Sequence, residues 1–108
     1  MSAVWGTLGQ TRPAATTLTV CYTVPALKHS AVQVIITNVG AGAATVRVSH
    51  AINGAADALA QYVIYDMTLT IAASSSTAKI ALRAGDIIRV YASTADVAFN
   101  VNGIEDDD

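Results

Sequence analysis

The sequence has few charged side chains and few side chains that bind metals. Asp, Glu, Lys and Arg make up 13% of its 108 residues, about half their share in an average soluble domain. The single cysteine, Cys21, excludes an intrachain disulfide, and this usage fits folding in a reducing cytoplasm. Together with the two histidines, His29 and His50, it matches no zinc-binding spacing. We therefore expect no metal, no cofactor and a buried, inert thiol.

Long apolar runs and clusters of positive charge are also missing. No uninterrupted apolar stretch approaches the ~18 residues of a membrane helix, and the first residues lack the pattern of a signal peptide. The basic residues are scattered rather than grouped into a stripe that could follow a phosphate backbone. They are Arg12, Lys28, Arg47, Lys79, Arg83 and Arg89. These absences predict no membrane partner and no nucleic-acid partner.

Apolar and uncharged polar residues are abundant instead. Hydrophobic residues make up 53% of the chain, so the surface must consist largely of Thr, Ser, Asn, Gln and Ala. A protein with such a surface has low solubility as an isolated monomer, and the surface suits burial against neighbouring molecules. The composition therefore indicates an assembly subunit, with a small Ala-rich monomer as the alternative.

Alternating apolar and polar residues predict β-strands through most of the chain. In the stretch 17–24, Leu18, Val20, Tyr22 and Val24 share one face, as in a half-buried strand. Further strands are predicted at 31–39, 43–52, 61–65, 68–72, 77–82, 87–92 and 97–104, with a turn at 74–76 and a loop with at most a short helix at 55–60. The last two strands are predicted to form a hairpin through 93–96. Seven or eight short strands at this spacing predict an all-β domain over residues 16–104, a jelly-roll-like sandwich of two antiparallel sheets.

The two ends of the chain differ from this pattern. Residues 1–15 show no period, and we predict an extended N-terminal arm with the apolar anchors Val4, Trp5 and Leu8, docked on its own body or on a neighbour. Residues 105–108 are all acidic and are predicted to form a solvated, extended C-terminal tail, because like charges repel. Arg12 is the fourth candidate interface residue of the N-terminal arm, beside Val4, Trp5 and Leu8.

Catalytic groups do not converge in the sequence. The four carboxylates outside the tail lie beside turns, where Asp side chains bind nearby backbone N–H groups. They are Asp57, Asp66, Asp86 and Asp96. His29 is predicted to be exposed in a turn, and His50 to be a satisfied, half-buried histidine on a strand. We therefore expect no enzymatic activity. Tyr62, Tyr65 and Tyr91 are predicted to lie at an interface, where tyrosine is favoured.

Two stretches resemble a known group of proteins. TLTVCYTVPALKHSAVQVIITNVGAGAATVRVSHA and LRAGDIIRVYASTADVAFNVNGIE resemble, in that order, patterns found in small β-sandwich structural proteins of tailed bacteriophages. The first has a strand ending in Tyr-Thr-Val-Pro-Ala, a short basic turn and a Thr-Val-Arg-Val strand. The second has an Ala-Gly-Asp turn that leads into Ile-Ile-Arg-Val. Lys28-His29 stands where the pattern has Gly-Lys, which leaves the type of that turn open.

The resemblance implies a virion component, best fitted by a capsid cement or decoration protein. Such proteins commonly form trimers on the capsid surface and bridge capsomers made of the major capsid protein, after synthesis in the cytoplasm of the bacterial host. Similar small sandwiches occur in tails, fibres and baseplates. A receptor- or glycan-binding module is therefore the second hypothesis, with the loop 53–57 and Tyr62 or Tyr65 as its candidate site.

Overall fold

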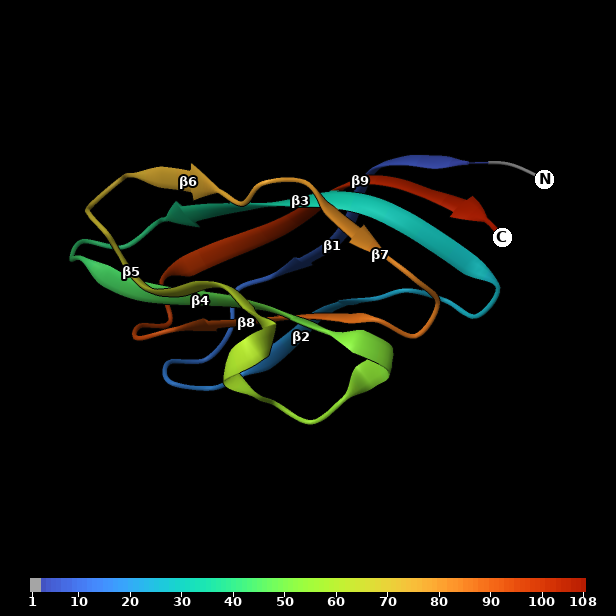
Figure 1. Cartoon of the computed structure of the whole chain (residues 1–108). Helices are drawn as coiled ribbons and strands as arrows, with labels where there is room; N and C mark the ends of the chain where they lie inside the picture. The colour runs from blue at the N-terminus through green and yellow to red at the C-terminus, as the bar shows by residue number, and fades with distance from the viewer. Residues whose placement is uncertain (1–2) are drawn as a thin grey trace.

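The computed structural model describes residues 3–108, which fold into two antiparallel sheets packed face to face (Figure 1). The strands are β1 (Val4–Thr11), β2 (Thr19–Thr23), β3 (Lys28–Asn38), β4 (Ala44–Ala51), β5 (Tyr62–Leu69), β6 (Ser74–Ser76), β7 (Ile80–Leu82), β8 (Ile87–Ala92) and β9 (Val97–Asp107). The helical segments are the short 3-10 turns η1 (Ile52–Gly54) and η2 (Leu59–Gln61). The predicted all-β sandwich is confirmed.

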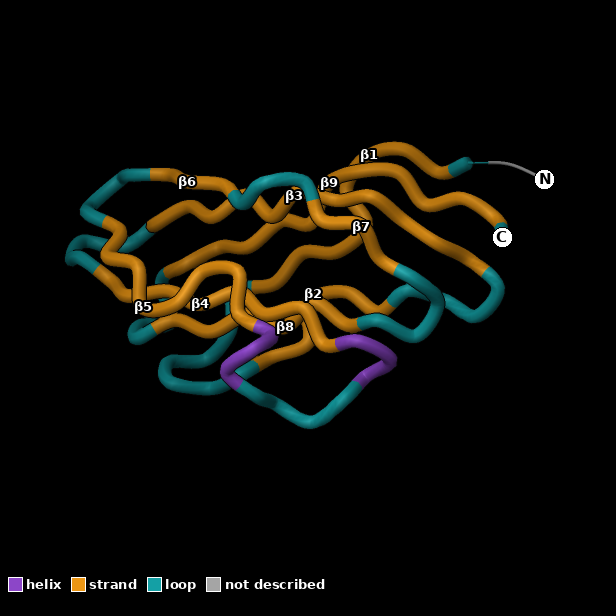
Figure 2. The backbone as a smooth tube through the Cα atoms, viewed as in Figure 1, coloured by secondary structure: helices purple, strands orange, loops and turns teal. Residues whose placement is uncertain are grey.

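Within each sheet, most neighbouring strands are distant in sequence (Figure 2). The five-stranded sheet has the order β1-β9-β3-β6, with β7 also paired to β3, and the four-stranded sheet has the order β2-β8-β4-β5. Alternate residues of the central strands point between the sheets and form the core. Fully buried side chains on the central strands of this core are Val32, Val34 and Ile36 of β3, Val46 and Val48 of β4, Ile88 and Val90 of β8, and Val97, Phe99 and Val101 of β9.

The predicted hairpin of the last two strands is wrong. β8 pairs with β2 and β4, whereas β9 pairs with β1 and β3, so residues 93–96 cross from one sheet to the other. Backbone hydrogen bonds hold both ends of this crossing, from Ser93 N to Thr45 O (2.9 Å) and from Val39 N to Asp96 O (2.8 Å). Both strands alternate in the same way, because each fills the middle of its own sheet. Alternation alone therefore did not reveal that they belong to different sheets.

Other differences come from local irregularities. Val20 and Tyr22, predicted to share a face, do not: a bulge lies between them, and Val20 is 51% exposed while Tyr22 is buried. The strand predicted at 61–65 continues through Asp66, whose φ is 52°, and ends at Leu69 as β5, whereas residues 70–72 of the strand predicted at 68–72 lie outside any strand. The serines at 74–76, predicted as a turn, pair with β3 as β6.

The N-terminal arm belongs to the sandwich. Residues 4–11 are extended as predicted, and as β1 they pair with β9 of the same chain, with Val4 opposite Glu105 and Thr11 opposite Phe99. β1 also approaches β2 so closely that a Cβ on Gly9 would overlap the carbonyl oxygen of Cys21. The predicted boundary at residue 15 therefore does not separate an arm from a domain. Residues 1–2 of the predicted arm lie outside the described residues.

The predicted solvated tail is also part of the sheet. β9 continues through Asp107, and its acidic residues find partners on β2 and β3. Tyr22 Oη donates to Glu105 Oε1 (2.7 Å), Lys28 Nζ to Asp107 Oδ1 (2.5 Å), and His29 Nδ1 lies 2.9 Å from Asp108 Oδ1. These contacts offset the repulsion among the carboxylates that led us to predict an extended tail.

The close approach at Gly9 gives a first test of β1. We expect Gly9→Ala to lower the free energy of unfolding by about 1–3 kcal/mol, because β1 or β2 must move to admit the methyl group. Gly42→Ala is the matched control, since a Cβ at Gly42 meets no atom within 4 Å. Thermal or urea unfolding measures both. Equal stability of the two variants would contradict the packing of β1 on β2.

Candidate interaction surface

The predicted tyrosines converge on the outer face of the four-stranded sheet. Tyr62 and Tyr65 lie on β5, Tyr91 lies on β8, and Arg47 of β4 lies between them, directly opposite Tyr91 in the strand register. Arg47 points outward because its neighbours on the strand, Val46 and Val48, are buried in the core. We call Arg47, Tyr62, Tyr65 and Tyr91 the Tyr–Arg face.

Arg47 is held between aromatic rings and a carboxylate. Its Cζ atom lies 4.5 Å from the ring centroids of both Tyr65 and Tyr91, which is within the range of cation–π contacts. Its Nε and Nη2 atoms donate to Asp66 Oδ1 and Oδ2 at 2.6 and 3.2 Å. The hydrogen bonds to Asp66 raise the pKa of Arg47 above its ordinary value. The guanidinium is therefore fixed in place before any partner binds.

The loop between β4 and β5 is tied to this face. Tyr62 Oη donates to Asp57 Oδ1 (2.9 Å), and Arg89 Nη1 donates to Ala55 O (2.9 Å). Partial burial of the Tyr62 ring, and then the hydrogen bond to Asp57, raise the pKa of the Tyr62 phenol. Tyr62 and Tyr65 also meet edge to face, with ring centroids 5.1 Å apart and an interplanar angle of 78°.

Exposed apolar side chains come from the same sheet and loop. They are Val20 of β2, Ile52 and Leu59 of the loop, and Val63 and Tyr65 of β5. Leu59 is 76% exposed. Exposed apolar groups on the same sheet and loop as aromatic and arginine side chains are typical of protein-binding surfaces.

The predicted interface residues of the arm form a separate group. Trp5 is 77% exposed and Val4 is 49% exposed, on the strand β1 of the other sheet, and Arg12 is exposed just after that strand. Leu8, predicted as an anchor for an interface, packs against the core instead. The structure therefore divides the predicted residues between the two sheets rather than joining them in one site.

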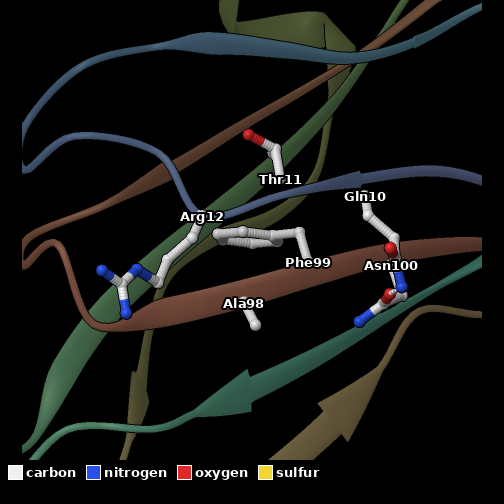
Figure 3. A pocket seen from close by; sticks show the side chains of 6 residues that line it. All are labelled: Gln10, Thr11, Arg12, Ala98, Phe99 and Asn100. Atoms are coloured by element: carbon white, nitrogen blue, oxygen red, sulfur yellow. Dashed lines mark hydrogen bonds between the residues drawn. The ribbon is translucent and has the colours of Figure 1, made fainter.

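A shallow hollow of about 310 Å³ lies beside Arg12. Figure 3 shows Arg12 extending on one side of Ala98, with the side chains of Gln10 and Asn100 together on the other side. Gln10 Nε2 donates to Asn100 Oδ1 (2.5 Å). Ala98 is small, and the hollow is open above it.

A second hollow contains the predicted half-buried histidine, and here the prediction is confirmed. His50 Nε2 lies 2.8 Å from Asp86 Oδ2, and the His50 side chain is 20% exposed. Asp86, which is buried, also accepts the backbone N–H groups of Asn53 (2.8 Å) and Arg83 (3.1 Å). The carboxylate thus joins η1 to the turn before β8, which is a structural role.

The remaining candidate groups for chemistry have local explanations. Within residues 3–108, no three His, Cys, Asp or Glu side chains are grouped as a metal site. Burial raises the pKa of the Cys21 thiol to about 11, so it stays protonated at neutral pH. His29 is 53% exposed, as predicted, although it lies in β3 rather than in a turn.

Comparison of the chain with protein-family models, with curated proteins and with solved structures gave no match in any of the three. None of the helical segments among residues 3–108 has the length and apolar character to cross a bilayer.

Arg47 is the central residue that the sequence interpretation missed. It was one of six scattered basic residues, and its outward position on a strand was visible from alternation. Its contacts with Tyr65 and Tyr91 depend on β4 lying between β5 and β8, and no pattern within one strand shows which strands are neighbours.

The contacts of Asp86 predict a loss of stability in acid. Burial favours the protonated form of Asp86, but its hydrogen bonds with Asn53, His50 and Arg83 outweigh burial and hold its pKa below the usual value. A carboxylate with a lowered folded-state pKa stabilises the fold above its unfolded pKa and stops doing so as the pH falls through the folded one. We expect Asp86→Asn to lower the free energy of unfolding by about 1–3 kcal/mol at pH 7.

The same variant should also show a weaker dependence of the melting temperature on pH between about 5 and 2. Asp96→Asn is the control with the same change in charge on an exposed side chain. If both variants lose stability equally, the role assigned to Asp86 is wrong.

Proposed function

We propose that this chain is a non-enzymatic structural subunit of a virion, a capsid decoration protein that attaches to the head of a tailed phage and bridges its capsomers. In this proposal it acts as a homotrimer, and its second partner is the major capsid protein. Support comes from the resemblance of its strand and turn patterns to phage sandwich proteins, from its weakly charged composition and from the Tyr–Arg face.

The Tyr–Arg face is the observation that carries this proposal. Tyrosine and arginine are enriched among the residues that dominate binding energy at protein interfaces. Arg47 is already fixed by Tyr65, Tyr91 and Asp66, so binding would cost little further side-chain entropy. Asp66 also balances the charge of the guanidinium within the chain, so a partner need not supply a carboxylate.

The size of the sheet suits attachment to a large surface. A standard interface removes about 800 Å² from each partner, roughly one-seventh of the 5566 Å² exposed by this chain. One sheet face with its bordering loop can provide such an area. The opposite sheet then remains free for contacts among sister subunits.

One observation favours the second candidate function, a tail, fibre or baseplate module that binds a receptor or glycan. The predicted sugar-binding groups do meet, because Asp57 of the loop accepts the hydroxyl of Tyr62 beside the ring of Tyr65. An aromatic ring beside a carboxylate is a suitable platform for a sugar. However, the Asp57 oxygen and the Tyr62 hydroxyl already bind each other.

Attachment through the Tyr–Arg face can be tested with two variants at one position. We expect Tyr65→Ala to weaken binding of the purified protein to capsid shells of its phage at least tenfold, since it removes a ring that supports Arg47. Tyr65→Phe keeps the ring and should bind about as well as the unaltered chain. Cosedimentation with shells at increasing protein concentration gives the dissociation constants.

The outcome also separates the two candidate functions. Unchanged shell binding by Tyr65→Ala would rule out the Tyr–Arg face as the attachment surface. Binding to a glycan array without any binding to shells would replace the decoration role by the receptor-binding one.

A further inference from the structure

The outer face of the five-stranded sheet carries two groups of opposite charge at its two ends. Arg12 lies just beyond the pairing of Thr11 with Phe99, and Asp106 lies seven residues further along β9. At about 3.4 Å per residue, the two ends are roughly 24 Å apart. Arg12 therefore cannot reach Asp106 within one chain.

The acidic end combines an exposed aromatic ring with a carboxylate. Trp5 pairs with Ile104 across β1 and β9, so their side chains share one face. Asp106 lies on the same face, because β9 keeps an unbroken register with β3 from Val97 to Asp107. The Asp106 carboxylate accepts the backbone N–H of Asp107 (2.8 Å), while Lys28 and His29 contact Asp107 and Asp108.

The basic end has a complementary form. Within residues 3–108, the Arg12 guanidinium has no ion pair and no side-chain hydrogen bond, although it has five N–H donors to offer. It borders the hollow over Ala98, with the Gln10 and Asn100 amides on the other side (Figure 3). This end can therefore bind a carboxylate beside an apolar group.

We propose that these two ends bind each other between copies of this chain. Asp106 of one copy would accept hydrogen bonds from Arg12 of the next copy. Trp5 of the first copy would pack on that Arg12 guanidinium and into the hollow over Ala98 of the next copy. Burial of an aromatic side chain of this kind removes about 150–250 Å² from water, and arginine stacks well on indole. The inference deepens the proposed function, because it rests on the self-association included there.

The charges at the two ends favour a second copy of this chain as the binding partner. The outward residues of β1, β9 and β3 between the two ends of the sheet are uncharged, so neighbouring copies meet no like charge on these strands. They include Thr7 on β1, Asn100 and Asn102 on β9, and Gln33 and Ile35 on β3. Each copy offers one end of each kind. Where copies meet only at their unlike ends, the contact is head to tail and can repeat around a closed ring, as in the proposed trimer.

Charge reversal tests this contact in the full chain. We expect Arg12→Glu alone and Asp106→Lys alone each to raise the dissociation constant of the oligomer at least tenfold, as measured by light scattering over a concentration series. The double variant R12E/D106K restores an opposite-charge pair between copies and should recover the oligomer. Trp5→Ala should weaken association, with Trp5→Phe intermediate.

Lys79→Glu is the matched control for Arg12→Glu, because Lys79 is also exposed and has the same change in charge. Circular dichroism and melting temperature verify that each variant is folded. A monomeric unaltered chain, single reversals that leave the mass unchanged, or a double variant that stays dissociated would each overturn the inference. If one of these results is found but the protein still binds capsid shells, the decoration role stands without this contact. If the double variant recovers the oligomer but binds no shell, the contact stands and the decoration role is contradicted.

Discussion

The pairing of β3 with β9 is the constraint on which the rest of the structure depends. These two eleven-residue strands run antiparallel from Lys28 opposite Asp107 to Asn38 opposite Val97 without a shift in register. Because a shift by one residue would move every core side chain to the solvent face, this register fixes both the core and the surface. β1 attaches to one side of the pair and β6 and β7 to the other. At Gly103 the strands come so close that a Cβ would overlap the carbonyl oxygen of Ala31.

The same pairing explains why the two ends of the chain are ordered. The acidic residues of β9 lie beside Lys28 and His29 because β3 begins where β9 ends. The N-terminal segment lies along β9 as an edge strand and presents Trp5 on the outer face. Both features depend on contacts between residues far apart in sequence, which no local pattern contains. For this reason an arm and a solvated tail were predicted where the structure has strands.

Local patterns were sufficient for much of the fold. The strands predicted at 43–52, 87–92 and 97–104 coincide closely with β4, β8 and most of β9, and the turns of Gly, Asn and Ser separated most strands. Alternation failed where the backbone is irregular, as at the bulge between Val20 and Tyr22. Alternation also did not show which sheet a strand belongs to, because β8 and β9 alternate alike but lie in different sheets. The candidate tyrosines could be chosen by residue type, but their meeting around Arg47 follows from strand order, which the sequence does not display.

The internal pairing of Arg47 with Asp66 makes the two outer faces electrically different. The Tyr–Arg face has its central charge neutralised within the chain, whereas the opposite sheet has, among residues 3–108, the Arg12 guanidinium without an ion pair at one end and the Asp106 carboxylate at the other. Dissolved ions screen attraction between exposed charges and have little effect on the burial of aromatic rings. In the proposed assembly, raised ionic strength would therefore weaken the Arg12–Asp106 contact between copies more than attachment through the tyrosines.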